Sequence, residues 1–140
     1  MKHLFASLSV AALVCSTSLF TASAQGLPPE MPVSRGDLMV RKAGGLLIDV
    51  RTPEEWTQTG VPVTAHTLSL QDPDFMATIE RLTKGDKARR IAFICRSGSR
   101  SAKARDRLLD AGYTNVTSIG GGVSGTDGWI DADLPVRPYP

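Results

Sequence analysis

The chain contains few of the residues that build disulfides, metal centres or nucleic-acid surfaces. Its 140 residues include two cysteines, two histidines and only 6% aromatic residues, and the formal net charge is +2. Beyond the N-terminal segment a single thiol, Cys95, and a single imidazole, His66, remain. These counts exclude an intramolecular disulfide and a usual metal centre there, and no cofactor is expected. The balanced charge and the scarcity of aromatic side chains also argue against binding to nucleic acid.

The N-terminus has the pattern of a secretory signal peptide. A basic start precedes a mostly apolar stretch over residues 4–20, and Ala22-Ser23-Ala24 supplies the small residues that a signal peptidase requires. Cleavage before Gln25 is predicted, which indicates a periplasmic or secreted protein with no stable membrane insertion after cleavage. A lipid on Cys15 is disfavoured, because Val14 stands where that signal needs a small residue.

The remainder is long enough for one domain and too short for two. Removal of residues 1–24 from the 140 leaves 116 residues, and no internal repeat is visible. Residues 25–32 are rich in proline and are predicted to form a flexible leading segment. Residues 33–140 are predicted to form a single domain.

Strand and helix patterns alternate along this domain. Continuous apolar runs predict strands that are covered on both faces. Strands are expected over residues 46–50, 91–94 and 116–119, with a short one within 63–70. Helices are expected over residues 34–42 with Ser34 as the N-cap, from Pro53 onward, over 74–82 and over 101–111. The alternation predicts an α/β fold with a mostly parallel central sheet and helices on both faces.

The most informative segment is the junction that follows the strand over 91–94. This strand ends at Cys95, and a short loop leads into the helix expected from Ser101; the loop residues are Arg96, Ser97, Gly98, Ser99 and Arg100. Loop amides and the unpaired amides of the helix start would converge on the sulfur and favour the thiolate. The alternative is that Cys95 is a buried residue with only a packing role, but such a cysteine would need neither Gly98 nor the two arginines of the loop. We therefore interpret Cys95 as a nucleophile.

Two polar residues follow the strand over 46–50. Asp49 and Arg51 would reach the same rim of the sheet as Cys95, because parallel strands end at one edge. A structural ion pair is favoured over a direct catalytic role, since polar groups at a buried strand end need partners. His66 is a candidate general base, but a structural role is favoured, because the amides can lower the thiol pKa without it.

Several separated motifs resemble the rhodanese (sulfurtransferase) family, in its order and spacing, over residues 33 to 137. The motifs are Asp49-Val-Arg51 with the acidic and aromatic segment Glu54-Glu55-Trp56, the loop Cys95 to Ser101, Gly112-Tyr113-x-Asn115-Val116, Gly120-Gly121-Gly122, and Gly128-Trp129 with Leu134-Pro135-Val136. The resemblance implies a rhodanese-like fold and a sulfurtransferase whose cysteine carries sulfur as a persulfide.

The implied partners are a small anionic sulfur donor and a thiol or cyanide acceptor. In the family, a charged residue directly after the cysteine accompanies thiosulfate use, so Arg96 indicates thiosulfate. Arg96 and Arg100 are expected to bind the donor, while the amides and hydroxyls of the loop through Ser101 hold the sulfur.

Two other functions use a similar loop. A non-catalytic carrier that delivers persulfide to a protein partner needs the same cysteine and is not excluded. A cysteine phosphatase or arsenate reductase is disfavoured, because the arginine of those loops stands where this chain has Ser101. The chain departs from the rhodanese pattern over residues 60–66, and its segment 123–128 is longer than usual. Because of these two departures, the resemblance does not identify the sulfur acceptor.

Overall fold

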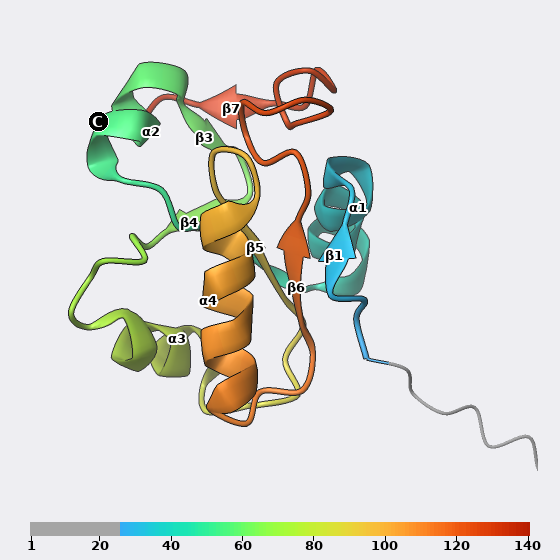
Figure 1. Ribbon diagram of the computed structural model, residues 1–140, viewed down its shortest axis with the longest axis vertical. Coiled ribbons are helices and arrows are strands. Elements are labelled where there is room, and N and C mark those ends of the chain that lie inside the picture. The colour runs from blue at the N-terminus through green and yellow to red at the C-terminus, as the bar shows by residue number, and fades with distance from the viewer. Residues whose placement is uncertain (1–25) are drawn as a thin grey trace, which may run out of the picture.

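A parallel five-stranded sheet forms the centre of the protein (Figure 1). The structure is a computed structural model that describes residues 26–140; the predicted signal peptide, residues 1–24 with Cys15, lies outside the described residues. Neighbouring strands follow the order β1-β6-β5-β2-β4 and every pair is parallel. The strands are β1 (Glu30–Met31), β2 (Leu46–Asp49), β4 (Ala65–Thr67), β5 (Ile91–Ile94) and β6 (Val116–Ile119).

Successive residues of the central strands face opposite sides of the sheet, as the two-residue period of a strand requires. Leu47, Ala92 and Ile94 join the core cluster on one face. Ile48, Ile91 and Phe93 join the cluster on the other. All of these side chains are fully buried, and each large one contributes roughly 1.5–3 kcal/mol by leaving water.

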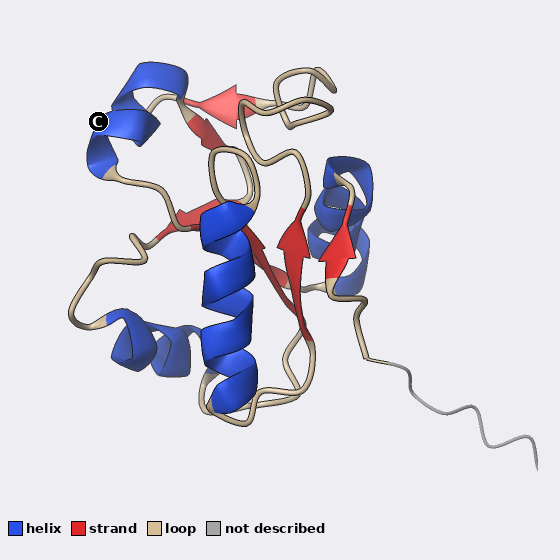
Figure 2. Cartoon of the chain, viewed as in Figure 1, coloured by secondary structure: helices blue, strands red, loops and turns tan. Residues whose placement is uncertain are grey.

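Helices cover both faces. Val33 and Met39 of α1 and Trp56 of α2 pack in the first cluster. Residues of α3 and α4 pack in the second. Figure 2 shows α4 crossing in front of the strands and α1 lying behind β1. The helices are α1 (Val33–Ala43), α2 (Pro53–Thr59), α3 (Phe75–Thr83) and α4 (Ser99–Asp110). The predicted α/β fold, a parallel sheet with helices on both faces, is confirmed.

The predicted helix starts differ from the structure in three places, and the difference at α3 is one residue, since that helix begins at Phe75. α1 begins at Val33 after Pro32, whose extended backbone places its carbonyl to accept from the amides of Arg35 and Gly36. The prediction that Ser34 caps this helix is therefore wrong. α4 begins at Ser99, two residues before the predicted start at Ser101, because the chain already turns at Gly98.

The leading segment contains a short edge strand, β1. β1 lies along β6: the Ser118 amide donates to the Pro29 carbonyl at 3.0 Å, and the Gly120 amide donates to the Met31 carbonyl at 3.0 Å. The Leu27 amide donates to Asn115 Oδ1 at 3.0 Å. The flexibility of residues 25–32 stays a prediction. The strand within them was not predicted, because a two-residue edge strand leaves no periodicity that a sequence could show.

A second, two-stranded sheet closes the carboxyl side of the domain. β3 (Val61–Pro62) pairs antiparallel with β7 (Val136–Arg137). Trp129 is fully buried and donates from Nε1 to the Pro135 carbonyl at 3.0 Å. Tyr139 packs on Trp56, with ring centroids 5.0 Å apart.

Within residues 26–140, no helix is both long and apolar enough to cross a bilayer.

Candidate active site

Cys95 follows the last residue of β5, at the carboxyl edge of the parallel sheet. The residue is only 1% exposed and packs with the core on the α3 and α4 side. The loop 96–98 then turns the chain into α4. This edge is where open parallel sheets bind their ligands, since the strand ends and the following helix starts converge there.

The loop holds the sulfur through short contacts. The Gly98 amide donates to Cys95 Sγ at 3.1 Å, and Ser101 Oγ lies 3.6 Å from the same sulfur. Ser101 is fully buried, and its hydroxyl donates to the Gly98 carbonyl at 2.8 Å. Gly98 has φ 115°, which residues with a Cβ rarely adopt. This glycine therefore permits the turn that aims an amide at Cys95.

These contacts decide the acidity of the thiol. Burial by itself raises the pKa of Cys95, because a thiolate in this place loses water. Hydrogen bonds from the Ser101 hydroxyl and from the amides of Ser101, Gly98 and Ser97 outweigh burial and lower the pKa below its ordinary value. The arrangement therefore favours the nucleophilic form of the sulfur.

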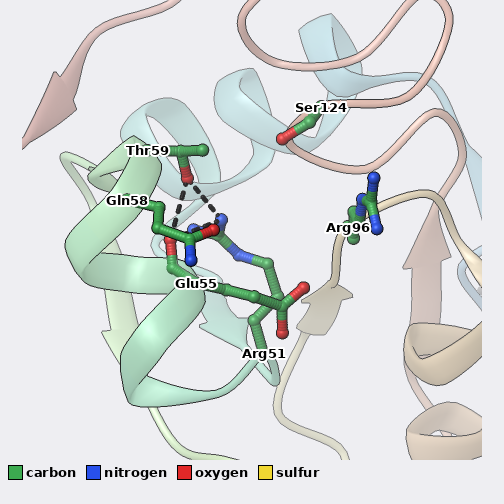
Figure 3. Close-up of a pocket in the computed structure, with 6 residues that line it drawn as sticks. All are labelled: Arg51, Glu55, Gln58, Thr59, Arg96 and Ser124. Atoms are coloured by element: carbon green, nitrogen blue, oxygen red, sulfur yellow. Dashed lines mark hydrogen bonds between the residues drawn. The ribbon is translucent and has the colours of Figure 1, made fainter.

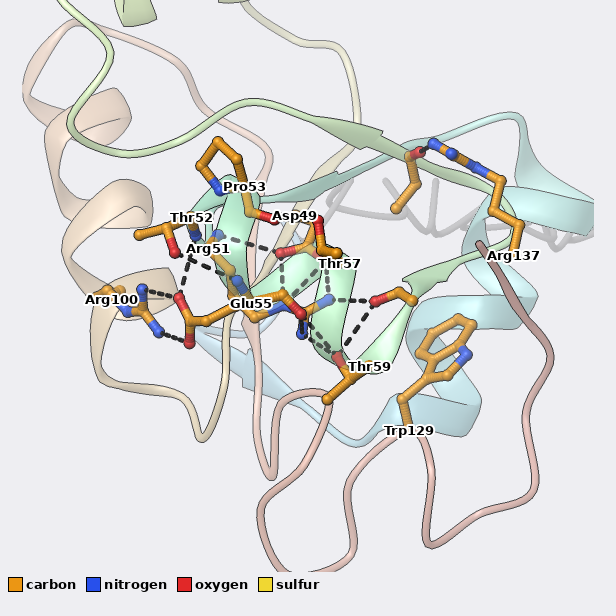
Figure 4. A network of polar contacts seen from close by, with 12 residues as sticks. Asp49, Arg51, Thr52, Pro53, Glu55, Thr57, Thr59, Arg100, Trp129 and Arg137 are labelled. Atoms are coloured by element: carbon orange, nitrogen blue, oxygen red, sulfur yellow. Dashed lines mark hydrogen bonds and ion pairs between the residues drawn. The ribbon is translucent and has the colours of Figure 1, made fainter. Parts of the chain in front are cut away.

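Arg100 is held by a carboxylate. Its guanidinium donates to both oxygens of Glu55, at 2.6 and 2.7 Å (Figure 4). Glu55 also accepts from the Thr52 amide at 3.0 Å and so completes the capping box of α2. The hydrogen bond from Arg100 is the main reason that the pKa of Glu55 falls to about 2. Arg100, expected from the sequence to bind the donor, is thus paired with Glu55.

Asp49 and Arg51 form the ion pair that the sequence favoured. The pair is 2.7 Å long and both side chains are buried. Arg51 also donates to Thr59 Oγ1 at 2.6 Å and to the Gly60 carbonyl at 2.7 Å. These bonds tie the end of β2 to the end of α2, so the pair positions the α2 side of the site.

The segment 121–128, which includes the residues 123–128 noted for their length, lies directly on the active loop. The Val123 amide donates to the Cys95 carbonyl at 2.8 Å, and the Ser124 amide donates to the Arg96 carbonyl at 3.0 Å. Gly122 has φ 60°, and a Cβ there would approach the Cys95 carbonyl oxygen to 2.5 Å. The glycine run before Val123 is the sequence signal for this close approach.

A cavity of about 250 Å³ lies between α2 and the active loop. Figure 3 shows side chains of α2 on one side of it and Arg96 and Ser124 on the other. The lining residues are Arg51, Glu55, Gln58, Thr59, Arg96 and Ser124. Ser124 lies in the segment 123–128 that was noted for its length, whereas Gln58 was not foreseen, because it belongs to no motif and only the fold brings it here.

The remaining candidates lie elsewhere. His66 is exposed on β4 and makes no hydrogen bond to Cys95. Trp56 and Trp129 are core residues. Within residues 26–140, no three side chains of the metal-binding types are grouped to hold an ion.

Comparison with known proteins decides the family. Residues 35–128 match the description "Rhodanese-like domain". The chain belongs to the rhodanese family. The matched residues include the loop from Cys95 to Ser101 and the Asp49–Arg51 segment.

Relatives and solved structures agree with this membership. An uncharacterized protein of Rickettsia prowazekii is 35% identical over 112 residues, which cover 71% of this chain and 88% of that protein. A protein of Arabidopsis thaliana named "Thiosulfate sulfurtransferase 16, chloroplastic" is 36% identical over 103 residues, 68% of this chain and 82% of the relative. The rhodanese-like domain of an Anabaena protein superposes with a TM-score of 0.64 at 16% identity, covering 81% of each chain, and so shares the fold.

Proposed function

We propose that this rhodanese is a sulfurtransferase that takes sulfane sulfur from thiosulfate, holds it as a persulfide on Cys95 and passes it to a thiol or cyanide. The observation that carries the proposal is the set of hydrogen bonds at Cys95, which lowers the pKa of the only thiol in residues 26–140. A cysteine that attacks as a thiolate and then carries a second, negatively charged sulfur needs hydrogen-bond donors around it.

In the first step the Cys95 thiolate attacks the outer sulfur of thiosulfate. A bond forms between the two sulfurs, the sulfur–sulfur bond of thiosulfate breaks, and sulfite leaves with the electron pair. The amides of Ser97, Gly98 and Ser101 stabilise the charge of the persulfide, as they stabilise the thiolate. The Ser101 hydroxyl can turn its proton from the Gly98 carbonyl toward the sulfur.

In the second step the thiolate of an acceptor, or cyanide, attacks the outer sulfur of the persulfide. The bond between the persulfide sulfurs breaks and its electron pair returns to Cys95. Arg96 is exposed beside the cysteine and forms no ion pair with any residue in 26–140, so we assign donor binding to it. Arg100 supports the site through Glu55 instead.

Mass measurement tests the proposal. The protein incubated with thiosulfate should gain the mass of one sulfur atom, lose it on addition of cyanide, and release thiocyanate. Cys95→Ser, a nearly isosteric change, should gain no sulfur and should keep the far-ultraviolet circular dichroism of the wild type. Sulfur transfer by Cys95→Ser would refute the mechanism. Loading without repeated turnover on any small acceptor would favour the persulfide carrier.

We also propose that the protein acts in the periplasm or outside the cell after removal of residues 1–24. Support comes from the sequence of the N-terminal segment. Mass analysis of the exported protein should give Gln25 as the first residue. Full-length protein in the cytoplasm, or a lipid on Cys15, would refute this location.

A further inference from the structure

The cavity beside the active loop is lined by two chemically different sets of side chains. Arg51 and Thr59 are bonded to each other at 2.6 Å, and Glu55 is bonded to Arg100, so these groups are occupied by protein partners. The side chains of Arg96, Gln58 and Ser124 make no hydrogen bond to other residues in the described part of the chain, and all three are exposed. The second group is therefore available to a ligand.

The three available groups are connected to the nucleophile. Arg96 follows Cys95 directly, and Ser124 is fixed to the Arg96 carbonyl by its own amide at 3.0 Å. Gln58 stands on α2, the helix that the Glu55–Arg100 pair joins to the start of α4. A molecule in the cavity would therefore lie next to the mouth of the sulfur site.

Charge and size limit what this molecule can be. Asp49 neutralises Arg51 and Glu55 neutralises Arg100, which leaves the charge of Arg96 as the only uncompensated one on the lining. The volume is about 250 Å³, whereas a water molecule occupies about 30 Å³ in the liquid. Cyanide would leave most of this space empty. A small organic molecule with one negative charge and a further polar group would fill it.

We propose that Gln58 and Ser124 determine acceptor specificity, and that the preferred acceptor is a small organic thiol that carries both a carboxylate and an amide. The carboxylate would accept from Arg96, and the amide would lie between the Gln58 carboxamide and the Ser124 hydroxyl. The thiolate of the same molecule would then attack the outer sulfur of the Cys95 persulfide. This inference rests on the sulfur transfer proposed above.

The test compares three thiols on the loaded protein. N-acetylcysteine carries a carboxylate and an amide, mercaptoacetate carries only the carboxylate, and mercaptoethanol carries neither. The protein is loaded with thiosulfate, freed of excess donor and mixed with each thiol, and loss of the persulfide is followed by mass. Each rate is divided by the concentration of the ionised thiol, so that differences in acidity among the three thiols do not enter the comparison. The wild type should react fastest with N-acetylcysteine and slowest with mercaptoethanol.

Variants assign the preference to residues. Gln58→Leu and Ser124→Ala should each reduce the ratio of the N-acetylcysteine rate to the mercaptoacetate rate by about two- to tenfold, the range expected for one lost hydrogen bond. The matched controls are Gln71→Leu and Ser34→Ala, which are exposed and do not line the cavity. Both controls should keep the wild-type ratio.

The outcomes separate the two proposals. A loaded protein that shows no preference among the three thiols, or variants that keep the wild-type ratio, would overturn the assignment of Gln58 and Ser124 and leave the sulfurtransferase intact. The ratio stays at the wild-type value when the rates with N-acetylcysteine and mercaptoacetate fall equally, and that pattern would show an effect of the substitution on cavity shape. Failure of thiosulfate to load Cys95 at all would overturn the sulfurtransferase and this inference together.

Discussion

Glu55 and Arg100 are 45 residues apart in the sequence and face each other through two hydrogen bonds of 2.6 and 2.7 Å. One belongs to the first turn of α2 and the other to the first turn of α4. Since Glu55 also closes the capping box with Thr52, one carboxylate stabilises a helix start and fixes the helix that follows Cys95. The pair thus links the cavity wall to the sulfur site.

The first prediction concerns acid stability. The pKa of Glu55 is lowered from 4.5 to about 2, chiefly by Arg100, so the unfolded chain takes up this proton first as the pH falls. The pair therefore contributes stability above about pH 4.5 that is lost toward pH 2. Urea titrations should show a steeper loss of the free energy of unfolding in this window for the wild type than for Glu55→Gln. Identical slopes for the two proteins would contradict the prediction.

The second prediction concerns the acidity of Cys95. The rate of alkylation by iodoacetamide should rise with a midpoint below that of the same protein unfolded in urea, because the folded pKa is lowered. Ser101→Ala should move the midpoint upward, since the Ser101 hydroxyl makes the largest of the contributions that lower it. A midpoint that is equal in folded and unfolded protein would show that the loop does not stabilise the thiolate.

The third prediction concerns Arg96. Arg96→Ala should raise the KM for thiosulfate about tenfold or more, the loss expected for a charge-assisted hydrogen bond, with smaller effects for singly charged or neutral donors. Arg89→Ala is the matched control, because Arg89 is exposed and does not line the cavity. Equal losses for all donors would mean that Arg96 shapes the loop and does not bind the dianion.

The central strands and Cys95 could be read from the sequence, whereas the surroundings of Cys95 could not. Residues 91–94 and 116–119 form strands as predicted. The first of them is a continuous apolar run, which is typical of a strand covered on both faces. The partner of Arg100 was missed, since a pairing between two helices depends on how they pack. Gln58 was missed because it belongs to no motif and only the fold brings it opposite Arg96 and Ser124. β1 was missed because edge pairing of two residues is decided by β6.

The fourth prediction concerns the buried pair below the site. Removing one partner of a buried ion pair leaves the other charge uncompensated and costs about 3–5 kcal/mol. Asp49→Asn should therefore lower the free energy of unfolding by about this amount, because Arg51 is 1% exposed. Asp106→Asn is the control: Asp106 is 60% exposed in its pair with Arg105, and its loss should cost less than about 1 kcal/mol. Comparable costs for the two variants in urea titrations would contradict the buried assignment.

The fifth prediction separates backbone strain from a clash at the active loop. Gly44 and Gly122 have nearly equal φ angles, 64° and 60°, so alanine at either position carries a similar backbone cost of roughly 1–2 kcal/mol. At Gly44 no atom lies within 4 Å of the added Cβ, whereas at Gly122 the Cβ meets the carbonyls of Cys95 and Arg96.

Gly122→Ala should therefore destabilise the protein more than Gly44→Ala does. It should also slow persulfide formation, because relief of the clash moves the peptides that precede the Gly98 amide, 3.1 Å from Cys95 Sγ. Gly44→Ala should load at the wild-type rate, since Gly44 ends α1, away from the cavity lining. Urea titration gives the first comparison and the rate of mass gain with thiosulfate gives the second. Wild-type loading by a folded Gly122→Ala protein would show that the contact of segment 121–128 with the loop does not position the amides at Cys95.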